Sequence, residues 1–227
     1  YNNLRFNARC NKGLIHFNYC GDIIDCVVFL HEITHLRNES LDTKTNRTEI
    51  NDFITESIAY AEEFIFLDFL KTKGYEDDYN NYLCDIFYNC LVFSDRVYYV
   101  NKILYVYKEK GNISKDSYTS IFKNHKNYEP AIKELYKLII SKNSYIELMW
   151  TFLGYISGLY LYIMYLEDHN YFQIVEELNE AITNEKCTWQ DIFRILKVNK
   201  PEELFKIMSE KIDYFVKNET LKLKQSN

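Results

Sequence analysis

Two histidines and a glutamate stand together in residues 27–36, which read VVFLHEITHL. His31 and His35 are four residues apart, so on a helix both imidazoles lie on one face and can reach a single metal ion. Glu32, beside the first histidine, would then face a water molecule held by that ion. The pattern H-E-x-x-H therefore predicts a metal site, although a pattern with so few fixed letters also occurs by chance.

A zinc ion bound by two histidines needs a third protein ligand, and the next helical stretch supplies a carboxylate. Residues 53–70, FITESIAYAEEFIFLDFL, carry Glu56 and, two helical turns later on the same face, Glu63. Glu56 is the candidate third ligand, and Glu63 could hold a ligand histidine in place by binding its other ring nitrogen. A histidine satisfied within an apolar core is the competing interpretation. The uncharged flanks of the motif and the glutamate helix favour the metal site.

Such a site has a defined chemistry. Zinc polarises a water molecule and a scissile carbonyl, while Glu32 takes the proton of the water and passes it to the leaving amine. Tyr155 and Tyr162, seven residues apart on one helical face, are candidate donors to the oxyanion that forms. Because the chain holds 21 tyrosines, aromatic core packing is the alternative for both.

The elements that must position these residues are predicted to be mainly helical. Only 6 Gly and 2 Pro occur among 227 residues, which favours long helices over sheets with many turns. Residues 4–20 predict a β-hairpin with its turn at residues 11–13. Helices are predicted from Ile23 to about Arg37, from residue 49 or 50 to Lys71, and over residues 79–108, 115–141, 143–167, 169–184, 188–197 and 201–217, with a fraying tail at 218–227.

Composition narrows the classes of partner and compartment. The net charge is −6, and no basic cluster is interleaved with aromatic residues, so we expect no nucleic acid partner. The six cysteines form no C-x-x-C pair, which is typical of reduced thiols and predicts a cytoplasmic protein. Matches to the N-glycosylation pattern leave a secretory or organellar location open, and they begin at Asn38, Asn46, Asn112 and Asn218.

One uncharged run is long enough to raise the question of a membrane span. Residues 149–166, MWTFLGYISGLYLYIMYL, contain no charged side chain. Their tyrosines are spread along the run, and Glu147, Glu167 and Asp168 flank it, so a buried helix is favoured and we expect no membrane partner. A membrane-associated helical protein with a chance H-E-x-x-H pattern is the alternative, and it predicts detergent dependence and no bound metal.

Three motifs together resemble the C-terminal catalytic part of the thimet oligopeptidase and oligoendopeptidase F family of zinc peptidases. That family reads H-E-x-G-H, then E-x-x-S-x-F-x-E, then G-Y-x-x-x-Y-Y-x-Y. The matching stretches are HEITH at 31–35, ESIAYAEE at 56–63 and GYISGLYLY at 154–162, in the same order. The segments before and after these motifs extend the resemblance over nearly the whole chain.

The resemblance implies a gluzincin-type helical metallopeptidase catalytic lobe with a small N-terminal β-hairpin. Residues 1–227 would form a single zinc metallopeptidase domain, the C-terminal part of a longer protein. The implied activity is that of a zinc-dependent metalloendopeptidase, in which a zinc-activated water attacks peptides or unfolded polypeptide. The implied site has one zinc ion per chain, the ligands His31, His35 and Glu56, the general base Glu32, the supporting residue Glu63, and the donors Tyr155 and Tyr162.

Departures from the family pattern keep a second function open. Thr34 stands where the family has glycine, and Trp150 stands where many members have histidine. The N-terminal region that forms the opposite wall of the channel in these peptidases is also missing from the sequence. The alternative is a catalytically inactive, peptidase-like binding or regulatory protein. By resemblance, residues 13–19 would lie at the cleft and could pair with an extended peptide, with His16 either facing substrate or simply exposed.

Overall fold

The computed structural model describes residues 8–11, 13–41, 49–112, 114–123, 142–167, 170–184 and 186–226. The described elements are mainly helical, which confirms the fold class expected from the low glycine and proline content. The chain divides into two compact units, one made of Tyr1–Leu83 with Leu153–Asn227 and the other of Cys84–Phe152. The single catalytic domain and its gluzincin-type fold stay predictions.

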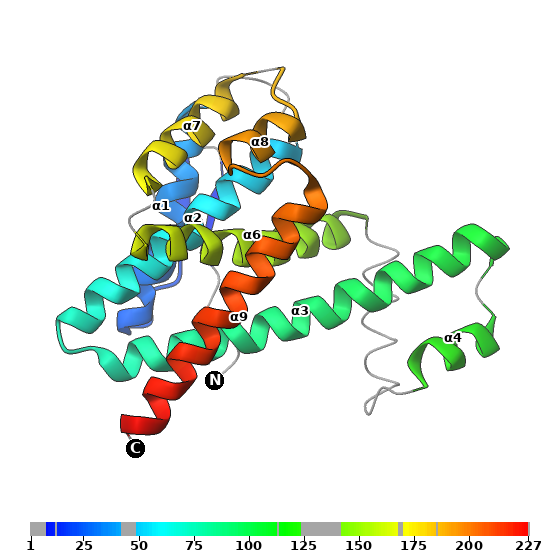
Figure 1. The fold of residues 1–227 in the computed structure, drawn as a ribbon, viewed down its shortest axis with the longest axis horizontal. Helices are drawn as coiled ribbons and strands as arrows, with labels where there is room; N and C mark the ends of the chain where they lie inside the picture. Colours follow the sequence, from blue (N-terminus) through cyan, green and yellow to red (C-terminus); the bar gives the residue numbers. More distant parts are fainter. Residues whose placement is uncertain are drawn as a thin grey trace. The chain divides into compact units, whose positions relative to one another are not determined.

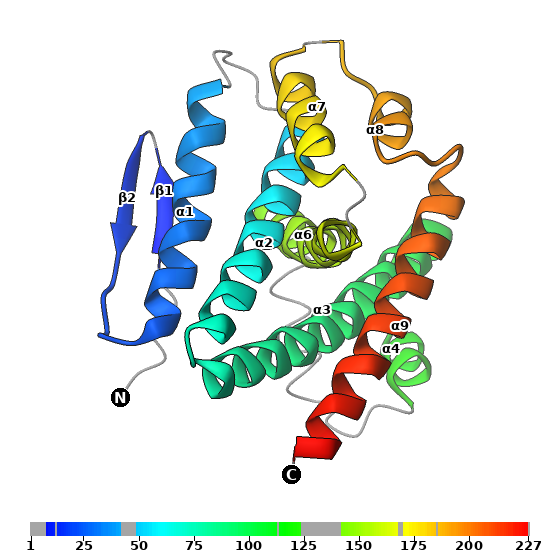
Figure 2. The same cartoon turned by 60° about the vertical axis from the view of Figure 1, so that its left-hand side comes forward.

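A β-hairpin comes first in the first unit. Strands β1 (Ala8–Asn11) and β2 (Leu14–Phe17) pair antiparallel, as the sequence predicted. In the short connection Gly13 has a φ of 74°, a left-handed conformation that glycine adopts without strain. The hairpin lies along helix α1 (Ile23–Leu41), with β1 nearer to the helix than β2 (Figure 2). One strand is therefore placed against the helix that carries the two histidines.

The side chain of Asp25 fixes the start of α1. Its buried carboxylate accepts hydrogen bonds from the backbone N–H groups of Cys20 and Gly21, at 2.7 Å each, and of Asp22, at 3.0 Å. A carboxylate is also favoured near a helix N-terminus by the helix dipole. These bonds tie the segment that leaves the hairpin to the first turn of α1. The helix then runs to Leu41, one turn past its predicted end.

Helix α2 (Glu49–Thr72) lies beside α1, and helix α6 (Lys142–Leu166) crosses α2 (Figures 1 and 2). On α2 almost every residue from 53 to 64 is buried, because neighbouring elements cover more than one face of this helix. On α6, residues 157–164 are all buried. Among the residues that the structure describes, none of the helices combines the length and the apolar character that a membrane span needs.

Two glycines allow α2 and α6 to approach closely. A Cβ atom at Gly154 would lie 2.7 Å from Cβ of Glu56, and one at Gly158 would lie 2.5 Å from Cβ of Tyr60. Real Cβ atoms do not approach one another so closely, so only glycine fits at either position without a shift of the backbones. The segment that begins the motif GYISGLYLY thus lies directly against the helix of Glu56.

The remaining helices agree with the predicted ranges at most ends. There are two exceptions. The helix predicted over 115–141 is described only as far as residue 123, where α4 has ended, and its later residues lie outside the described residues. Helix α9 continues to Ser226 and so includes most of the segment predicted to fray. In the second unit Tyr99 of α3 stacks on Phe122 of α4, with ring centroids 4.7 Å apart. The bounds are α3 Glu76–Lys110, α4 Lys115–Phe122, α7 Tyr171–Thr183, α8 Trp189–Ile195 and α9 Pro201–Ser226.

Candidate metal centre

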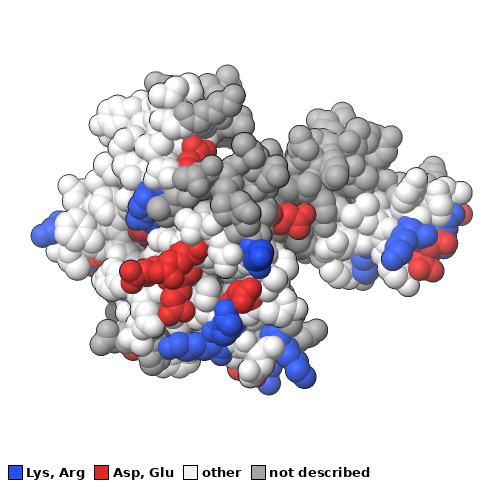
Figure 3. Space-filling model, turned by 90° about the horizontal axis from the view of Figure 1, so that it is seen from above, with Lys and Arg blue, Asp and Glu red and all other residues white. Residues whose placement is uncertain are grey.

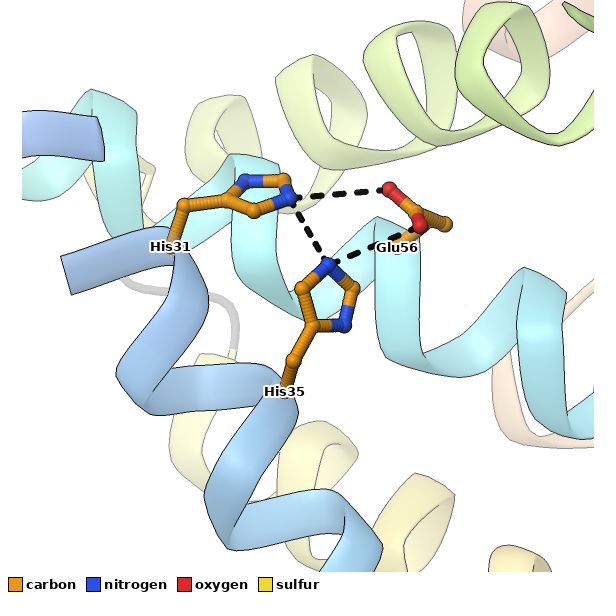
Figure 4. Close-up of side chains that lie close together, drawn as sticks. All are labelled: His31, His35 and Glu56. Carbon is orange, nitrogen blue, oxygen red and sulfur yellow. Dashed lines mark hydrogen bonds and ion pairs between the residues drawn. The ribbon is translucent and has the colours of Figure 1, made fainter. Parts of the chain in front are cut away.

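His31, His35 and Glu56 converge between α1 and α2 (Figure 4). The two Nε2 atoms of the histidines are 2.8 Å apart. The carboxylate of Glu56 lies 3.7 Å from Nε2 of His31 and 3.5 Å from Nε2 of His35. The side chains are 12%, 13% and 22% exposed, in the order His31, His35, Glu56, so the group is largely buried but reaches solvent.

These separations suit a metal ion. Donor atoms held by a tetrahedral zinc ion at about 2.0–2.1 Å lie roughly 3.3 Å from one another. The separations of 2.8, 3.5 and 3.7 Å lie on either side of that value. Two imidazole lone pairs directed at each other repel unless a cation or a proton lies between them. Two imidazoles and one carboxylate also form a donor set that zinc accepts, with a fourth position left for water or substrate.

Glu63 contacts His31 on the side of the ring away from His35 and Glu56. Its Oε1 atom lies 2.6 Å from Nδ1 of His31, a buried nitrogen, in a carboxylate–imidazole contact. When the imidazole is neutral, a proton on Nδ1 faces Glu63 and leaves the lone pair of Nε2 free for a metal. Glu63 therefore contacts the imidazole of His31, and its supporting role toward a metal ligand stays a prediction.

The carboxylates around His31 change its acidity. Burial by itself lowers the pKa of the imidazole, but the charges of Glu63, Glu56 and Glu32 outweigh burial and raise that pKa to about 9. In the metal-free protein at neutral pH, His31 therefore carries a second proton. A metal ion must displace this proton, since only the neutral imidazole is a ligand.

Glu32 is buried beside His31 and is bound by the hairpin. The backbone N–H of Cys10, in β1, donates a hydrogen bond to its Oε2 atom. The carboxylate is close enough to raise the pKa of His31, yet it is not one of the three converging donors. The predicted general base therefore adjoins the ligands and has its orientation set by a strand.

Thr34, where the resembling family has glycine, fits within an unbroken α1. Its side chain is buried, and its hydroxyl lies 3.1 Å from the carbonyl oxygen of Leu30 and also contacts the carboxylate of Glu62 on α2. Arg37 donates to the same carboxylate at 2.8 Å. The threonine therefore joins α1 to α2 one residue before His35 and leaves both histidines in place.

Tyr155 reaches the site through a residue that sequence reasoning missed. The ring of Tyr60 stands edge-on to the imidazole of His31, at 4.8 Å between centroids, and stacks on Tyr155 at 4.0 Å. Burial, followed by the proximity of Tyr155 and Glu56, raises the pKa of Tyr60 well above its ordinary value, so its phenol stays protonated. The sequence holds one indication that Tyr60 lies near the site: it follows Glu56 by four residues and so shares its helix face.

The ring of Tyr162 packs among other aromatic side chains. The side chain is 1% exposed, and its ring packs on Phe64 at 5.5 Å and on Phe215 at 5.8 Å. Two helical turns separate it from Tyr155, roughly 10 Å along the axis of α6. These contacts agree with the aromatic-core alternative for Tyr162, and its oxyanion role stays a prediction.

Other residues singled out in the sequence do not join the site. His16 is exposed on β2, opposite Arg9 of β1. Asn38 is buried on α1, at 2% exposure, so its glycosylation pattern is not an accessible acceptor. The side chain of Trp150 lies outside the described residues.

A second residue that sequence reasoning missed is Tyr82 on α3. Its hydroxyl donates a hydrogen bond of 2.6 Å to Oε2 of Glu63, the carboxylate that supports His31. No spacing rule links positions 63 and 82, which lie on different helices, so only the tertiary structure reveals this contact.

On the face seen in Figure 3, several Asp and Glu side chains gather in one patch, while the Lys and Arg side chains are scattered over that face.

No family model matches the chain, and neither a curated protein nor a solved structure matches it at a significant level. The family resemblance therefore depends on the three sequence motifs.

Proposed function

We propose that this chain is a zinc-dependent metallopeptidase that hydrolyses peptide bonds in peptides or unfolded segments, in the manner of the oligopeptidases that its motifs resemble. The observation that carries the proposal is the convergence of His31, His35 and Glu56, whose donor atoms lie within 4.8 Å of one another. The group joins both histidines of an H-E-x-x-H motif to a carboxylate from the following helix. This is the three-ligand set of many zinc peptidases.

Each supporting residue has a role in this proposal. Bound zinc would supply Lewis-acid chemistry, polarising a substrate carbonyl and making an attacking water more acidic. Glu32 would take a proton from that water and deliver it to the leaving amine. The N–H of Cys10 holds the Glu32 carboxylate in one orientation beside His31. Tyr155, stacked on Tyr60, is the candidate donor to the carbonyl oxygen of the substrate.

One observation favours a second candidate function, a metal-binding protein without turnover. The carboxylate of Glu32 already accepts a hydrogen bond from the backbone of β1. A carboxylate oxygen that already accepts a hydrogen bond has fewer lone pairs with which to take a proton from water. If that contact persists when a peptide is bound, the chain would bind metal and peptide without cleaving the peptide.

The proposal is tested by measuring zinc per chain and the cleavage of a quenched fluorescent peptide library. Glu56→Gln should lose zinc, whereas Glu32→Gln should keep zinc and lose cleavage. Glu39→Gln is the matched control, because Glu39 also lies on α1 and accepts a hydrogen bond from a hairpin amide, that of Gly13 at 3.1 Å. This control should keep both zinc and cleavage, since Glu39 lies two turns beyond Glu32.

The outcomes separate the two candidates. Stoichiometric zinc, with cleavage that Glu32→Gln abolishes and Glu39→Gln preserves, supports the peptidase. Stoichiometric zinc without cleavage of any library member supports the metal-binding protein. Absence of zinc from the wild-type chain, after purification with zinc in the buffers, would refute both.

A further inference from the structure

Glu63 is shared between the metal centre and a different helix. Its Oε1 atom lies 2.6 Å from Nδ1 of His31, and its Oε2 atom accepts the hydroxyl of Tyr82 at 2.6 Å. Tyr82, Glu63 and His31 therefore form a continuous chain of polar contacts from α3 through α2 to α1. These contacts reach Nδ1 of His31, and the other ring nitrogen, Nε2, faces His35 and Glu56.

The position of Tyr82 is set by the corner between α2 and α3. Gly74, with a φ of 94°, turns the chain, and the N–H of Tyr75 bonds to the carbonyl of Leu70 at 3.1 Å. One turn later the buried ring of Tyr79 packs beneath the ammonium group of Lys71, 4.5 Å from the ring centroid. These contacts fix the first turns of α3 against the end of α2. Tyr82 then follows Tyr79 by three residues, on the side that faces α2.

Glu63 needs both contacts because it is deeply buried. The residue is 3% exposed, and a carboxylate removed from water has to be compensated by donors at its oxygen atoms. The terminal torsion of a glutamate is broad, so the plane of a carboxylate is set by its partners and not by its rotamer. The Tyr82 hydroxyl engages Oε2 and so fixes the plane in which Oε1 meets the imidazole.

We propose that Tyr82 is a positioning residue for the metal centre. It holds the Glu63 carboxylate so that Glu63 keeps a proton on Nδ1 of His31 and directs Nε2 toward His35 and Glu56. This inference rests on the proposed metal site. A purely structural Tyr82 would join α3 to α2 and leave the metal affinity of the folded protein unchanged.

The test compares zinc affinity, by competition with a chromophoric chelator, in the wild type, Tyr82→Phe, Glu63→Gln and the double variant. Loss of a residue that supports a metal ligand typically weakens binding about 10–100-fold. Tyr82 acts one contact further out, so we expect Tyr82→Phe to weaken binding about tenfold, the lower end of that range. In the Glu63→Gln background the same change should have almost no effect, because the residue through which it acts is already altered.

Tyr75→Phe is the control, since Tyr75 lies at the same helix corner and its side chain is 44% exposed. It should bind zinc as the wild type does. Far-UV circular dichroism and thermal unfolding of the metal-free variants show how much each change affects folding, and affinities are compared for folded protein. A lower melting temperature with unchanged affinity would overturn the inference, as would an equal effect of Tyr82→Phe in both backgrounds. If the wild type binds no zinc, the proposed function fails and this inference fails with it.

Discussion

The approach of α6 to α2 at Gly154 should control the position of Glu56, a proposed metal ligand, and the substitution Gly154→Ala tests this. A Cβ atom at this position would lie 2.7 Å from Cβ of Glu56 and 3.0 Å from a ring carbon of Tyr60. Carbon atoms pack at about 3.5–4.0 Å, so one helix must move by about 1 Å. A shift of about 1 Å is several times the roughly 0.2 Å tolerance of a metal–ligand distance.

The expected changes in stability and in affinity differ. Overpacking lowers the free energy of unfolding by about 1–3 kcal/mol, and replacing glycine by alanine within a helix raises it by about 1 kcal/mol. The net loss of about 0–2 kcal/mol should lower the melting temperature by at most about 8 °C. The displacement of Glu56 should weaken zinc binding about tenfold or more, as does the loss of a supporting contact.

Gly158→Ala is the matched comparison. Its Cβ would meet Cβ of Tyr60 at 2.5 Å and backbone atoms of Ser57 and Ala61 at 3.1 and 3.0 Å, but it would not meet a ligand. Gly158→Ala should therefore lower the melting temperature at least as much as Gly154→Ala does, and it should weaken zinc binding less. Chelator competition and thermal unfolding measure both quantities. Wild-type zinc affinity in folded Gly154→Ala would refute the reasoning, and so would a greater loss of affinity in Gly158→Ala.

Four further predictions concern residues of α1. Because carboxylates raise the pKa of His31 from 6.5 to about 9, its contribution to the stability of the metal-free protein should be complete below pH 6.5 and lost as the pH rises through 9. Zinc binding at pH 7 should accordingly release about one proton from this residue, measured by calorimetry in buffers of different ionisation enthalpy, and no release would contradict this. Thr34→Val removes the hydroxyl that contacts Glu62 and should lower the free energy of unfolding, measured with urea, by about 1–2 kcal/mol while the zinc content stays unchanged. A loss of zinc would show instead that the hydroxyl positions a ligand. Asp25→Ala leaves three backbone amides without their carboxylate and should lower the free energy of unfolding by about 1.5–3 kcal/mol, so an unchanged urea midpoint would argue against that role.

The parts of the fold that could be predicted are those governed by local rules. The hairpin follows from a turn with glycine at a left-handed position, and α1 and α2 follow from apolar residues at helical spacing. The His31–His35 pair needs only the repeat of a helix. The convergence of Glu56 needs in addition that two successive helices pack side by side, which a short connection favours.

The parts that could not be predicted depend on contacts between distant helices. Tyr82 is one tyrosine among 21, and no spacing distinguishes it from those that are exposed. The spacing of Tyr60 places it on the helix face of Glu56, but it does not show that the ring packs against His31. Tyr162 shares a helix face with Tyr155, but α6 passes neighbours of different character along its length. Periodicity gives the direction in which a side chain points from its own helix, and it does not give what lies there.

The proposed metal ligands and their supporting carboxylate all come from residues 31–63, whereas Tyr155 follows about ninety positions later. The centre is therefore assembled from contacts of short sequence separation, which form early and quickly in folding, while the candidate donor arrives by closing a long loop. The two glycines of α6 mark the junction at which this late contribution docks. Metal capture and catalytic competence should thus be acquired at different stages of folding, and changes that slow the docking of α6 should delay the second without delaying the first.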